Sequence, residues 1–342
     1  MNRQGRLNRY IACAMAVAAL LTLAGCAGAQ SALDPAGPQS GRISKLWWLM
    51  FWVCSAVFAL VMTYLLLALV RSPRASDNTV MKPGAEPRKT RAVAAGVIAT
   101  VVILFAFLIA DLFVGRGISS LSSSGPVTIE VIGHQWWWEF RYDDPIPNRI
   151  VTTANEIHVP VGQPVQLITT SNDVIHSFWA PNLHGKRDLI PGHLTTTWLQ
   201  ADRPGLFRGQ CAEFCGHQHA HMSFVVIAEQ PDEFYAWLDA QRMPAPQPAG
   251  PDEQHGQQVF LSSTCIMCHT VQGTRANGRV APDLTHVASR RLIAAGALAN
   301  TRDNLADWIV DSQRIKPGNK MPPHNLSPGD LQALLSYLES LK

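Results

Sequence analysis

The stretch Cys211-Ala-Glu-Phe-Cys215-Gly-His-Gln-His219-Ala-His-Met222 decides how the middle of this 342-residue chain folds. It places two thiols four residues apart, an imidazole four residues later and a thioether three residues after that. Soft sulfur ligands combined with imidazole favour copper over hard cations. Two cysteines at this separation can bridge two metal ions. If His176 folds beside this loop, the set is complete for a dinuclear copper electron-transfer centre.

Two other interpretations of the loop are weaker. A disulfide between Cys211 and Cys215 is one alternative in an oxidising compartment, but it leaves the imidazole and the thioether without a purpose. A zinc site is the other, but tetrahedral zinc sites rarely use methionine. His217 and His221 alternate with His219 along the chain. We expect these two side chains to face solvent or to lie behind the ligands.

The composition predicts a membrane protein with external domains and argues against a nucleic-acid-binding protein. The formal charge is +3, but Arg3, Arg6 and Arg9 belong to a predicted signal peptide. Without them, 25 basic side chains balance 25 acidic ones, whereas nucleic-acid-binding proteins carry a basic face. The hydrophobic content of 47% is high for a soluble protein, and the excess is concentrated in three N-terminal stretches.

The first of these stretches is typical of a secretory signal. Residues 1–25 contain the three arginines followed by an apolar run that ends in Leu-Ala-Gly before Cys26. This ending resembles a bacterial lipobox, so we expect a lipoprotein-type signal peptide and a lipidated Cys26. Ordinary cleavage nearby and retention as a helix are the alternatives. Residues 26–45 then form an external N-terminal segment.

The other two stretches predict a transmembrane hairpin. Residues 46–70 and 92–114 each exceed the roughly 20 apolar residues that cross a bilayer. The loop between them, residues 71–91, carries six basic side chains against two acidic ones. The positive-inside rule places this loop in the cytoplasm. We therefore expect a multi-pass protein of the bacterial inner membrane, in contact with lipid and with its large domains on the external, periplasmic side.

Residues 120–230 predict an all-β domain. Apolar residues alternate in four short runs, which are separated by Gly, Pro, Asn and Asp clusters. The runs are Val127–Ile132, Glu156–Val159, Pro164–Thr169 and Met222–Ile227. Short strands with regular turns favour a Greek-key sandwich or barrel, with the sulfur-rich loop just before the last strand.

Residues 231–251 predict a short helix, Asp232–Arg242, followed by a semi-rigid Pro-rich linker. Residues 252–342 predict a mostly helical domain, with helices over Gln254–Leu261, Thr301–Ser312 and Pro328–Leu341. Three further histidines in this region match no motif, and we expect them at the surface: His255, His286 and His324.

A haem attachment motif lies in this helical domain. Cys265-Ile-Met-Cys268-His269 allows two thioether bonds to the haem while the histidine reaches the iron. Met321 follows 52 residues after His269 and is the candidate for the sixth ligand. His/Met ligation raises the potential, as an electron carrier requires. The alternative for Met321 is a linker or core methionine.

These motifs together resemble a known family. Gly133-His-Gln-Trp136-Trp-Trp, Asp173-Val-Ile-His176, Ile190-Pro-Gly-His and the Cys211–Met222 loop occur in this order. Over roughly residues 40–230 the chain resembles subunit II of the haem–copper cytochrome c oxidases, whose external domain is a cupredoxin with a copper A centre. Residues 252–342 resemble a class I cytochrome c. The fusion of the two resembles the caa-type oxidases.

The resemblance implies site residues one by one. The copper A ligands would be bridging Cys211 and Cys215, one histidine per copper from His176 and His219, and weak ligands from Met222 and the backbone carbonyl of Glu213. The Glu213 side chain would bind magnesium at the contact with subunit I, which suits a hard ion. Trp136 would be the residue through which electrons reach the copper.

The resemblance also implies a function. The chain would be the electron-input subunit of an aerobic terminal oxidase, taking electrons from reduced cytochrome c or a membrane donor through haem c and copper A. Subunit I, in contact with this and other subunits, would reduce dioxygen to water with proton translocation, so catalysis belongs to the complex. The alternatives are a copper A subunit of a nitric oxide reductase and a membrane-tethered copper-binding protein. One departure concerns Glu86: its surroundings do not match the proton-channel glutamate of many members.

Overall fold

The computed structural model describes residues 28, 30–71, 86–119 and 125–342, which form two units. One unit is Gly41–Leu121, and the other combines the residues up to Ser40 with those from Ser122 to Lys342. The predicted signal peptide, the lipidation candidate Cys26 and most of the predicted cytoplasmic loop lie outside the described residues.

Two long helices carry the apolar segments: α2 (Pro38–Arg71) and α3 (Glu86–Ser119). Both are long and apolar enough to cross a membrane, and their apolar windows are exposed in this chain. The helical prediction for 46–70 and 92–114 is confirmed, but each helix is longer than predicted. The prediction counted only apolar residues, whereas the polar residues at the ends continue the same hydrogen-bonded turns. The side chain of Glu86 lies outside the described residues.

The residues from 125 to 230, here called the sandwich domain, form two main sheets. The larger has the order β3 (Val151–Ala154), β2 (Trp137–Tyr142), β1 (Val127–His134), β5 (Val165–Ser171) and β8 (Thr195–Leu199). The smaller has the order β4 (Glu156–Pro160), β10 (Ser223–Glu229) and β9 (Gly205–Gln210). A separate hairpin pairs β6 (His176–Phe178) with β7 (Arg187–Leu189). The four predicted strands begin and end within two residues of their predicted bounds.

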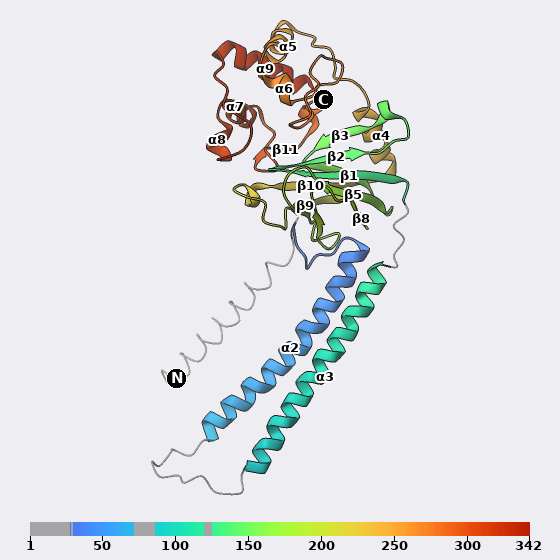
Figure 1. The fold of residues 1–342 in the computed structure, drawn as a ribbon, viewed down its shortest axis with the longest axis vertical. Helices are drawn as coiled ribbons and strands as arrows, with labels where there is room; N and C mark the ends of the chain where they lie inside the picture. The colour runs from blue at the N-terminus through green and yellow to red at the C-terminus, as the bar shows by residue number, and fades with distance from the viewer. Residues whose placement is uncertain (1–27, 29, 72–85, 120–124) are drawn as a thin grey trace, which may run out of the picture. The chain divides into compact units, whose positions relative to one another are not determined.

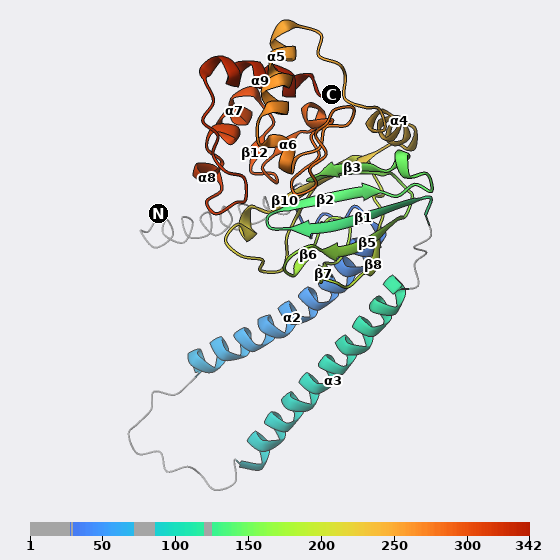
Figure 2. The ribbon, with the colours of Figure 1, turned by 45° about the horizontal axis from the view of Figure 1, so that its top comes forward.

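Aromatic rings fill the space between the two sheets. Trp138 and Phe140 of β2 pack edge-on against Phe224 of β10, with ring centroids 5.3 and 6.0 Å apart. Phe178 of β6 stacks on Phe224 at 4.3 Å. All four side chains are fully buried. The sandwich therefore supports the loop between β9 and β10, which are labelled in Figure 1; Figure 2 shows the same sheets from another direction.

The segment before α2 and the first turn of α2 are attached to the sandwich domain. The Ala36 N–H donates to the carbonyl oxygen of Asn182 at 2.7 Å. The Gln39 amide donates to the carbonyl oxygen of Trp198 at 2.8 Å, and the Ser40 hydroxyl donates to that of Asn182 at 2.6 Å. All three attached residues are buried. This part of the predicted external segment is therefore an integral piece of the sandwich domain.

Residues 252–342, here called the C-terminal domain, are mostly helical and follow α4 (Pro231–Gln241). Its helices are α5 (Pro251–Ser262), α6 (Cys265–Cys268), α7 (Arg302–Val310), α8 (Ser312–Ile315) and α9 (Pro328–Ser340), drawn in orange to red in Figure 1. A small hairpin of β11 (Leu292–Ile293) and β12 (Leu298–Ala299) adds to them. The predicted helix Thr301–Ser312 ends early at Val310, because the Asp311 side chain accepts the Arg314 N–H at 3.1 Å and caps a new helix.

The surface prediction for His286 is wrong. Its side chain is buried, and its ring nitrogens lie 2.9 Å from the carbonyl oxygen of Lys342 and 3.0 Å from that of Met243. His286 thus connects the linker before the domain with the last residue of the chain. No sequence motif marks it because both partners are backbone carbonyls.

The crossing of α5 and α9 requires a glycine. A Cβ atom on Gly256 would lie 2.0 Å from the carbonyl oxygen of Ala333 in α9. That distance is far below contact, so a larger residue would force the two helices apart. The helices form the core of the C-terminal domain around Phe260 and Tyr337, whose rings lie 5.9 Å apart.

We therefore predict that Gly256→Ala destabilises the C-terminal domain by about 1–3 kcal/mol, the usual cost of overpacking a core. Thermal unfolding of the full chain, followed by the absorption of its haem, measures this loss. Gly329→Ala in α9 is the matched control, because its new methyl would meet nothing closer than the Ser327 hydroxyl at 4.0 Å. Equal stability of the two variants would contradict the close-crossing argument.

His184 is a buried histidine in the sandwich core. Its ring stacks on Phe178 with centroids 5.2 Å apart, and its Nδ1 donates to the Gly185 carbonyl. Its Nε2 has no hydrogen-bond partner among the residues that the structure describes. Burial lowers the pKa of His184 to about 4 from an ordinary 6.5. The folded chain therefore holds this imidazole neutral.

This burial predicts a pH dependence of stability. Between pH 6.5 and 4 the unfolded chain binds the His184 proton more readily than the folded chain does. The free energy of unfolding therefore falls as the pH drops through this window, by up to about 3 kcal/mol. His184→Leu should lose less stability over the same window, whereas the exposed control His193→Leu should follow the parent. Denaturant titrations at several pH values would refute this if His184→Leu and the parent lost stability equally.

Candidate copper and haem sites

The Cys211–Met222 loop connects β9 to β10 and is fixed at its base. The Cys211 N–H donates to the carbonyl oxygen of Met222 at 2.9 Å, which closes the loop on itself. The Ala212 N–H donates to the carbonyl oxygen of Ser177 in β6, also at 2.9 Å. These bonds bring the loop against the strand that begins at His176, as the sequence predicted.

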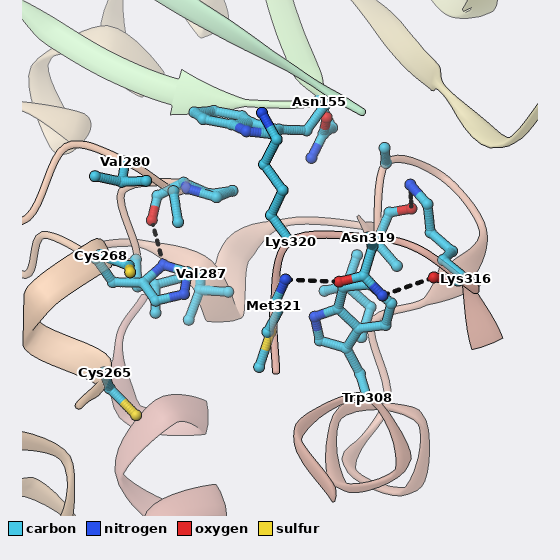
Figure 3. A pocket seen from close by; sticks show the side chains of 18 of the residues that line it. Asn155, Cys265, Cys268, Val280, Val287, Trp308, Lys316, Asn319, Lys320 and Met321 are labelled. Atoms are coloured by element: carbon cyan, nitrogen blue, oxygen red, sulfur yellow. Dashed lines mark hydrogen bonds between the residues drawn. The ribbon is translucent and has the colours of Figure 1, made fainter. Parts of the chain in front are cut away.

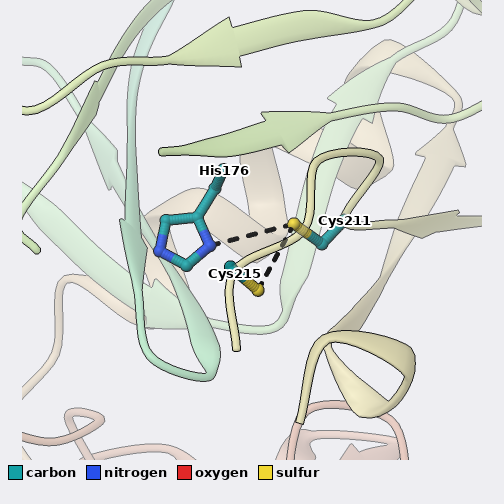
Figure 4. Close-up of side chains that lie close together, drawn as sticks. All are labelled: His176, Cys211 and Cys215. Carbon is teal, nitrogen blue, oxygen red and sulfur yellow. Dashed lines mark hydrogen bonds between the residues drawn. The ribbon is translucent and has the colours of Figure 1, made fainter. Parts of the chain in front are cut away.

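Two thiols form the centre of the site. The sulfur atoms of Cys211 and Cys215 are 3.8 Å apart (Figure 4). A disulfide has its sulfurs about 2 Å apart, and both cysteines are free. The disulfide alternative therefore does not describe this arrangement.

Each sulfur has an imidazole on its own side. The Cys211 sulfur lies 3.8 Å from Nδ1 of His176, and the Cys215 sulfur lies 3.6 Å from Nδ1 of His219. The Met222 sulfur is 3.8 Å from the Cys215 sulfur, and the Glu213 carbonyl oxygen is 3.2 Å from the Cys211 sulfur. The structure thus brings together all six predicted copper A groups.

The donor set fits a soft metal pair. Cys211, Cys215, Met222 and His176 are at most 2% exposed. The hydrogen bond shared with Cys215 lowers the pKa of the Cys211 thiol to about 3, and the same bond raises the pKa of Cys215. One thiolate is therefore ready to bind, and the second proton would leave when a metal binds, because metal ligation requires the thiolate.

A carboxylate orients the first histidine. Nε2 of His176 lies 2.9 Å from the Asp173 carboxylate, so Nδ1 faces the sulfur atoms. Burial raises the pKa of Asp173, but hydrogen bonds from His176 and from the Gln135 N–H outweigh it and hold this pKa well below its usual range. Such an outer hydrogen bond fixes the ring orientation of a metal-binding histidine. Sequence reasoning did not assign Asp173 a role, although it lies three residues before His176 in the quoted motif.

Other side chains of the loop are exposed to solvent to different extents. His217 and His221 are exposed, in agreement with the prediction. The Glu213 side chain is partly exposed and lies 3.7 Å from the Lys186 ammonium. Its carboxylate therefore points away from the sulfur atoms, while its carbonyl oxygen faces them.

The C-terminal domain contains a cavity of about 310 Å³ at its haem attachment motif. Cys265, Cys268, His269 and Met321 all line it. In Figure 3 the two cysteines lie on one side of the cavity and Met321 reaches in from the other. This size suits a small-molecule or cofactor site.

Both predicted iron ligands are held in place by their surroundings. Nδ1 of His269 donates to the Pro282 carbonyl at 2.7 Å, which leaves Nε2 for iron, and burial lowers the pKa of this imidazole. The Met321 carbonyl accepts hydrogen bonds from Ser312 at 2.6 Å and from Gln313 at 2.9 Å. The residues present therefore fit a covalently attached haem.

The sandwich domain forms one wall of the same cavity. Gln135, Trp136, Trp137 and Asn155 line it together with the haem attachment motif. The indole N–H of Trp136 donates to the carbonyl oxygen of Cys215 at 2.9 Å. Trp136 thus contacts the copper loop while lining the haem cavity. Sequence reasoning did not predict this shared wall, because no motif records which surface of one domain covers the other.

Comparisons with known proteins agree with these two sites. Residues 145–229 match the family described as cytochrome c oxidase subunit II, periplasmic domain, and residues 253–342 match the cytochrome c family. The cytochrome c oxidase subunit 2 of Alkalihalophilus pseudofirmus is 36% identical over 336 residues, which cover 94% of each chain. The chain belongs to the cytochrome c oxidase subunit 2 family.

Other subunit 2 proteins match over parts of the chain. The cytochrome c oxidase subunit 2 of Bacillus subtilis is 33% identical over 227 residues, which cover 63% of this chain and 62% of that one. The crystal structure of the periplasmic domain of subunit II of the cytochrome oxidase of Bradyrhizobium japonicum has 33% identity and a TM-score of 0.33, and the match covers 35% of this chain and 95% of that one.

Membership of the subunit 2 family makes this chain the electron-input subunit of a terminal oxidase, associated with subunit I and other oxidase subunits. The two domain families imply copper A and haem c, and the candidate sites match them. A membrane-anchored subunit with external domains agrees with the two apolar helices. The family thus favours the oxidase over the nitric oxide reductase and the copper-binding protein.

We predict that Asp173→Asn lowers the copper affinity of this subunit 2 by about 10–100-fold, because the outer partner of His176 loses its charge. Competition with a copper chelator, read by the copper absorption of the full chain, gives the affinity. Asp202→Asn, an exposed acid on the same domain, should bind copper as the parent does. Parent-like affinity in Asp173→Asn would show that the carboxylate does not support the ligand.

Proposed function

We propose that electrons enter this subunit at its C-terminal domain and reach the copper loop through Trp136, from which they pass to subunit I. The observation that carries this proposal is the position of Trp136. Trp136 lines the haem cavity, and its indole N–H donates to the backbone carbonyl of Cys215. Bound haem c and copper A would each accept and release one electron, with little change in geometry at a site made rigid by the protein.

The copper ligands proposed are those that the loop and β6 bring together. Cys211 and Cys215 would supply thiolates shared by the two metals, and His176 and His219 would supply one imidazole to each copper. Met222 and the Glu213 carbonyl are the weak ligands. The support is the 3.2 to 3.8 Å spacing of neighbouring donor atoms in this set. Burial excludes water from the site, so solvent reorganisation on electron transfer stays small.

For haem c, we propose covalent attachment at Cys265 and Cys268 with His269 and Met321 as axial ligands. The hydrogen bond from His269 to Pro282 supports the first axial ligand, because it fixes which ring nitrogen is free. The bonds to the backbone of Met321 support the second, because they hold its segment at the cavity. The external electron donor proposed is reduced cytochrome c or a membrane carrier.

A magnesium ion at the contact with subunit I is a further part of the proposal. The Glu213 side chain supports it because its carboxylate is partly exposed beside the copper loop. A hard ion prefers such oxygen ligands. In this arrangement one residue would serve both metals, with its carbonyl toward copper and its carboxylate toward magnesium. The membrane proposed is the bacterial inner membrane, with both domains in the periplasm.

The test of this proposal is to replace Trp136, the proposed relay residue. We predict that Trp136→Leu slows reduction of the copper centre by at least about tenfold after rapid reduction of the haem, since small displacements on a reaction path cost this much or more. The rate is measured by flash reduction of the full chain with both cofactors bound. The control is Trp237→Leu, which removes an indole that stacks on His158 at 3.8 Å, away from the haem cavity.

Copper and haem content, with the copper EPR spectrum, must match the parent in both variants, so that a slow rate is not a loss of cofactor. An unchanged rate in Trp136→Leu would contradict the proposed relay. A loss of rate in Trp237→Leu as large as in Trp136→Leu would show that the effect is general damage to the sandwich.

A further inference from the structure

A buried lysine joins the two domains. Lys316 lies between α8 and Met321 and is only 2% exposed. Its ammonium donates to the carbonyl oxygens of Trp136 at 3.1 Å and His221 at 2.9 Å, both in the sandwich domain. Its third bond reaches the carbonyl of Ala294 in the C-terminal domain at 3.1 Å. An ammonium has three N–H donors, so all of them are used.

The hydrogen bonds of this buried ammonium depend on contact between the two domains. Burying a charged group costs free energy unless its hydrogen bonds are satisfied. Burial lowers the pKa of Lys316 to about 7. Two of its three acceptors belong to the sandwich domain. If the domains separated, the ammonium would lose both and would return to water.

Other polar contacts lie on both sides of Lys316. The Gln218 amide donates to the Pro317 carbonyl at 2.8 Å. The Ser223 N–H and hydroxyl both donate to the carbonyl of Ala295, at 3.1 and 2.9 Å. The buried Glu156 carboxylate accepts the backbone N–H of Leu292 at 3.1 Å. Residues 291–295 and 316–317 therefore form one continuous contact with the copper loop and its supporting strands.

The turn that supplies the Ala294 and Ala295 carbonyls has an unusual backbone. Ala294 and Ala295 both have positive φ angles, 54° and 57°, which non-glycine residues rarely adopt. Gly296 follows with a φ of 78°, and a Cβ atom there would lie 2.1 Å from the Ser223 hydroxyl. The turn is thus shaped to fit the sandwich domain closely, at some cost to its own backbone.

We propose that Lys316 is a positioning residue that locks the C-terminal domain onto the sandwich domain, so that the fused cytochrome is a fixed relay. The opposite arrangement is a cytochrome that swings on the Pro-rich segment 243–251 and docks only transiently. The functional meaning of this lock rests on the proposed electron route. One hydrogen bond of Lys316 holds the backbone of Trp136, so the lock also fixes a residue of that route. The docking itself is a separate structural statement and has its own test.

The test uses the full chain with copper and haem bound. Hydrogen–deuterium exchange of residues 218–223 and 291–296 reports docking without reference to electron transfer. In the parent these segments should be protected, and in Lys316→Met their exchange should be faster by at least about tenfold, since removal of one partner from a buried polar contact is costly. The matched control is Arg314→Met, which removes an equal charge two residues earlier from an exposed pair with Asp307. It should keep the parent's protection.

The electron-transfer readout separates a fixed relay from a swinging one. In the parent and in Arg314→Met, the rate between haem and copper should not change with solvent viscosity. In Lys316→Met the rate should be lower than in the parent, and it should decrease further as the viscosity rises. The reason is that the C-terminal domain must now search for its docked position. A viscosity-dependent rate in the unmodified parent would overturn the proposal without any variant, even if Lys316→Met failed to fold.

Two further outcomes distinguish the lock from the electron route. Parent-like protection in Lys316→Met would overturn the lock and leave the Trp136 route standing. Loss of protection with an unchanged, viscosity-independent rate would support the lock and contradict the route.

Discussion

The rest of this structure depends on keeping two thiols 3.8 Å apart inside a protein without letting them form a disulfide. Two thiolates this close would repel each other when no metal lies between them. The hydrogen bond with Cys211, burial and the charge of the ionised Cys211 together raise the pKa of Cys215, so that only one of the two sulfur atoms is ionised. The loop holds them because its two ends are bonded to each other and because its start is also bonded to β6. The aromatic core of the sandwich makes that frame rigid. A copper pair would then enter a site whose geometry is set in advance.

Burial of this centre creates a second requirement, which is a path for the electron. Water cannot reach the sulfur atoms, so a donor must couple through the protein. Trp136 meets this requirement because it contacts the Cys215 backbone and also lines the haem cavity. The two domains act together only while this wall is shared, and the hydrogen bonds of Lys316 and Ser223 lie around it. Stability of the interface and function of the relay therefore have the same physical origin.

The two candidate sites and the sandwich could be predicted from the sequence, because haem attachment and metal ligation require fixed spacings between residues. The intervals in the Cys211–Met222 loop and in Cys265–His269 identified both sites, and strand alternation placed the sandwich. Other features left no local signal. Lys316 and His286 are single residues whose partners are backbone carbonyls far away in the chain. α7 ends early because Asp311 caps the next helix, although the helical pattern in the sequence continues past this point. Tertiary contacts of this kind cannot be predicted from periodicity.

The most direct test of the account is the metal content of the full chain, matured with copper and haem, together with its copper EPR spectrum. The account predicts two coppers per haem and one unpaired electron shared by both coppers, since two shared thiolates and one imidazole per metal would make the strong ligands of the two positions alike. One haem without stoichiometric copper, or a single copper with a localised electron, would contradict it. The Cys211 and Cys215 thiols would then have a different purpose.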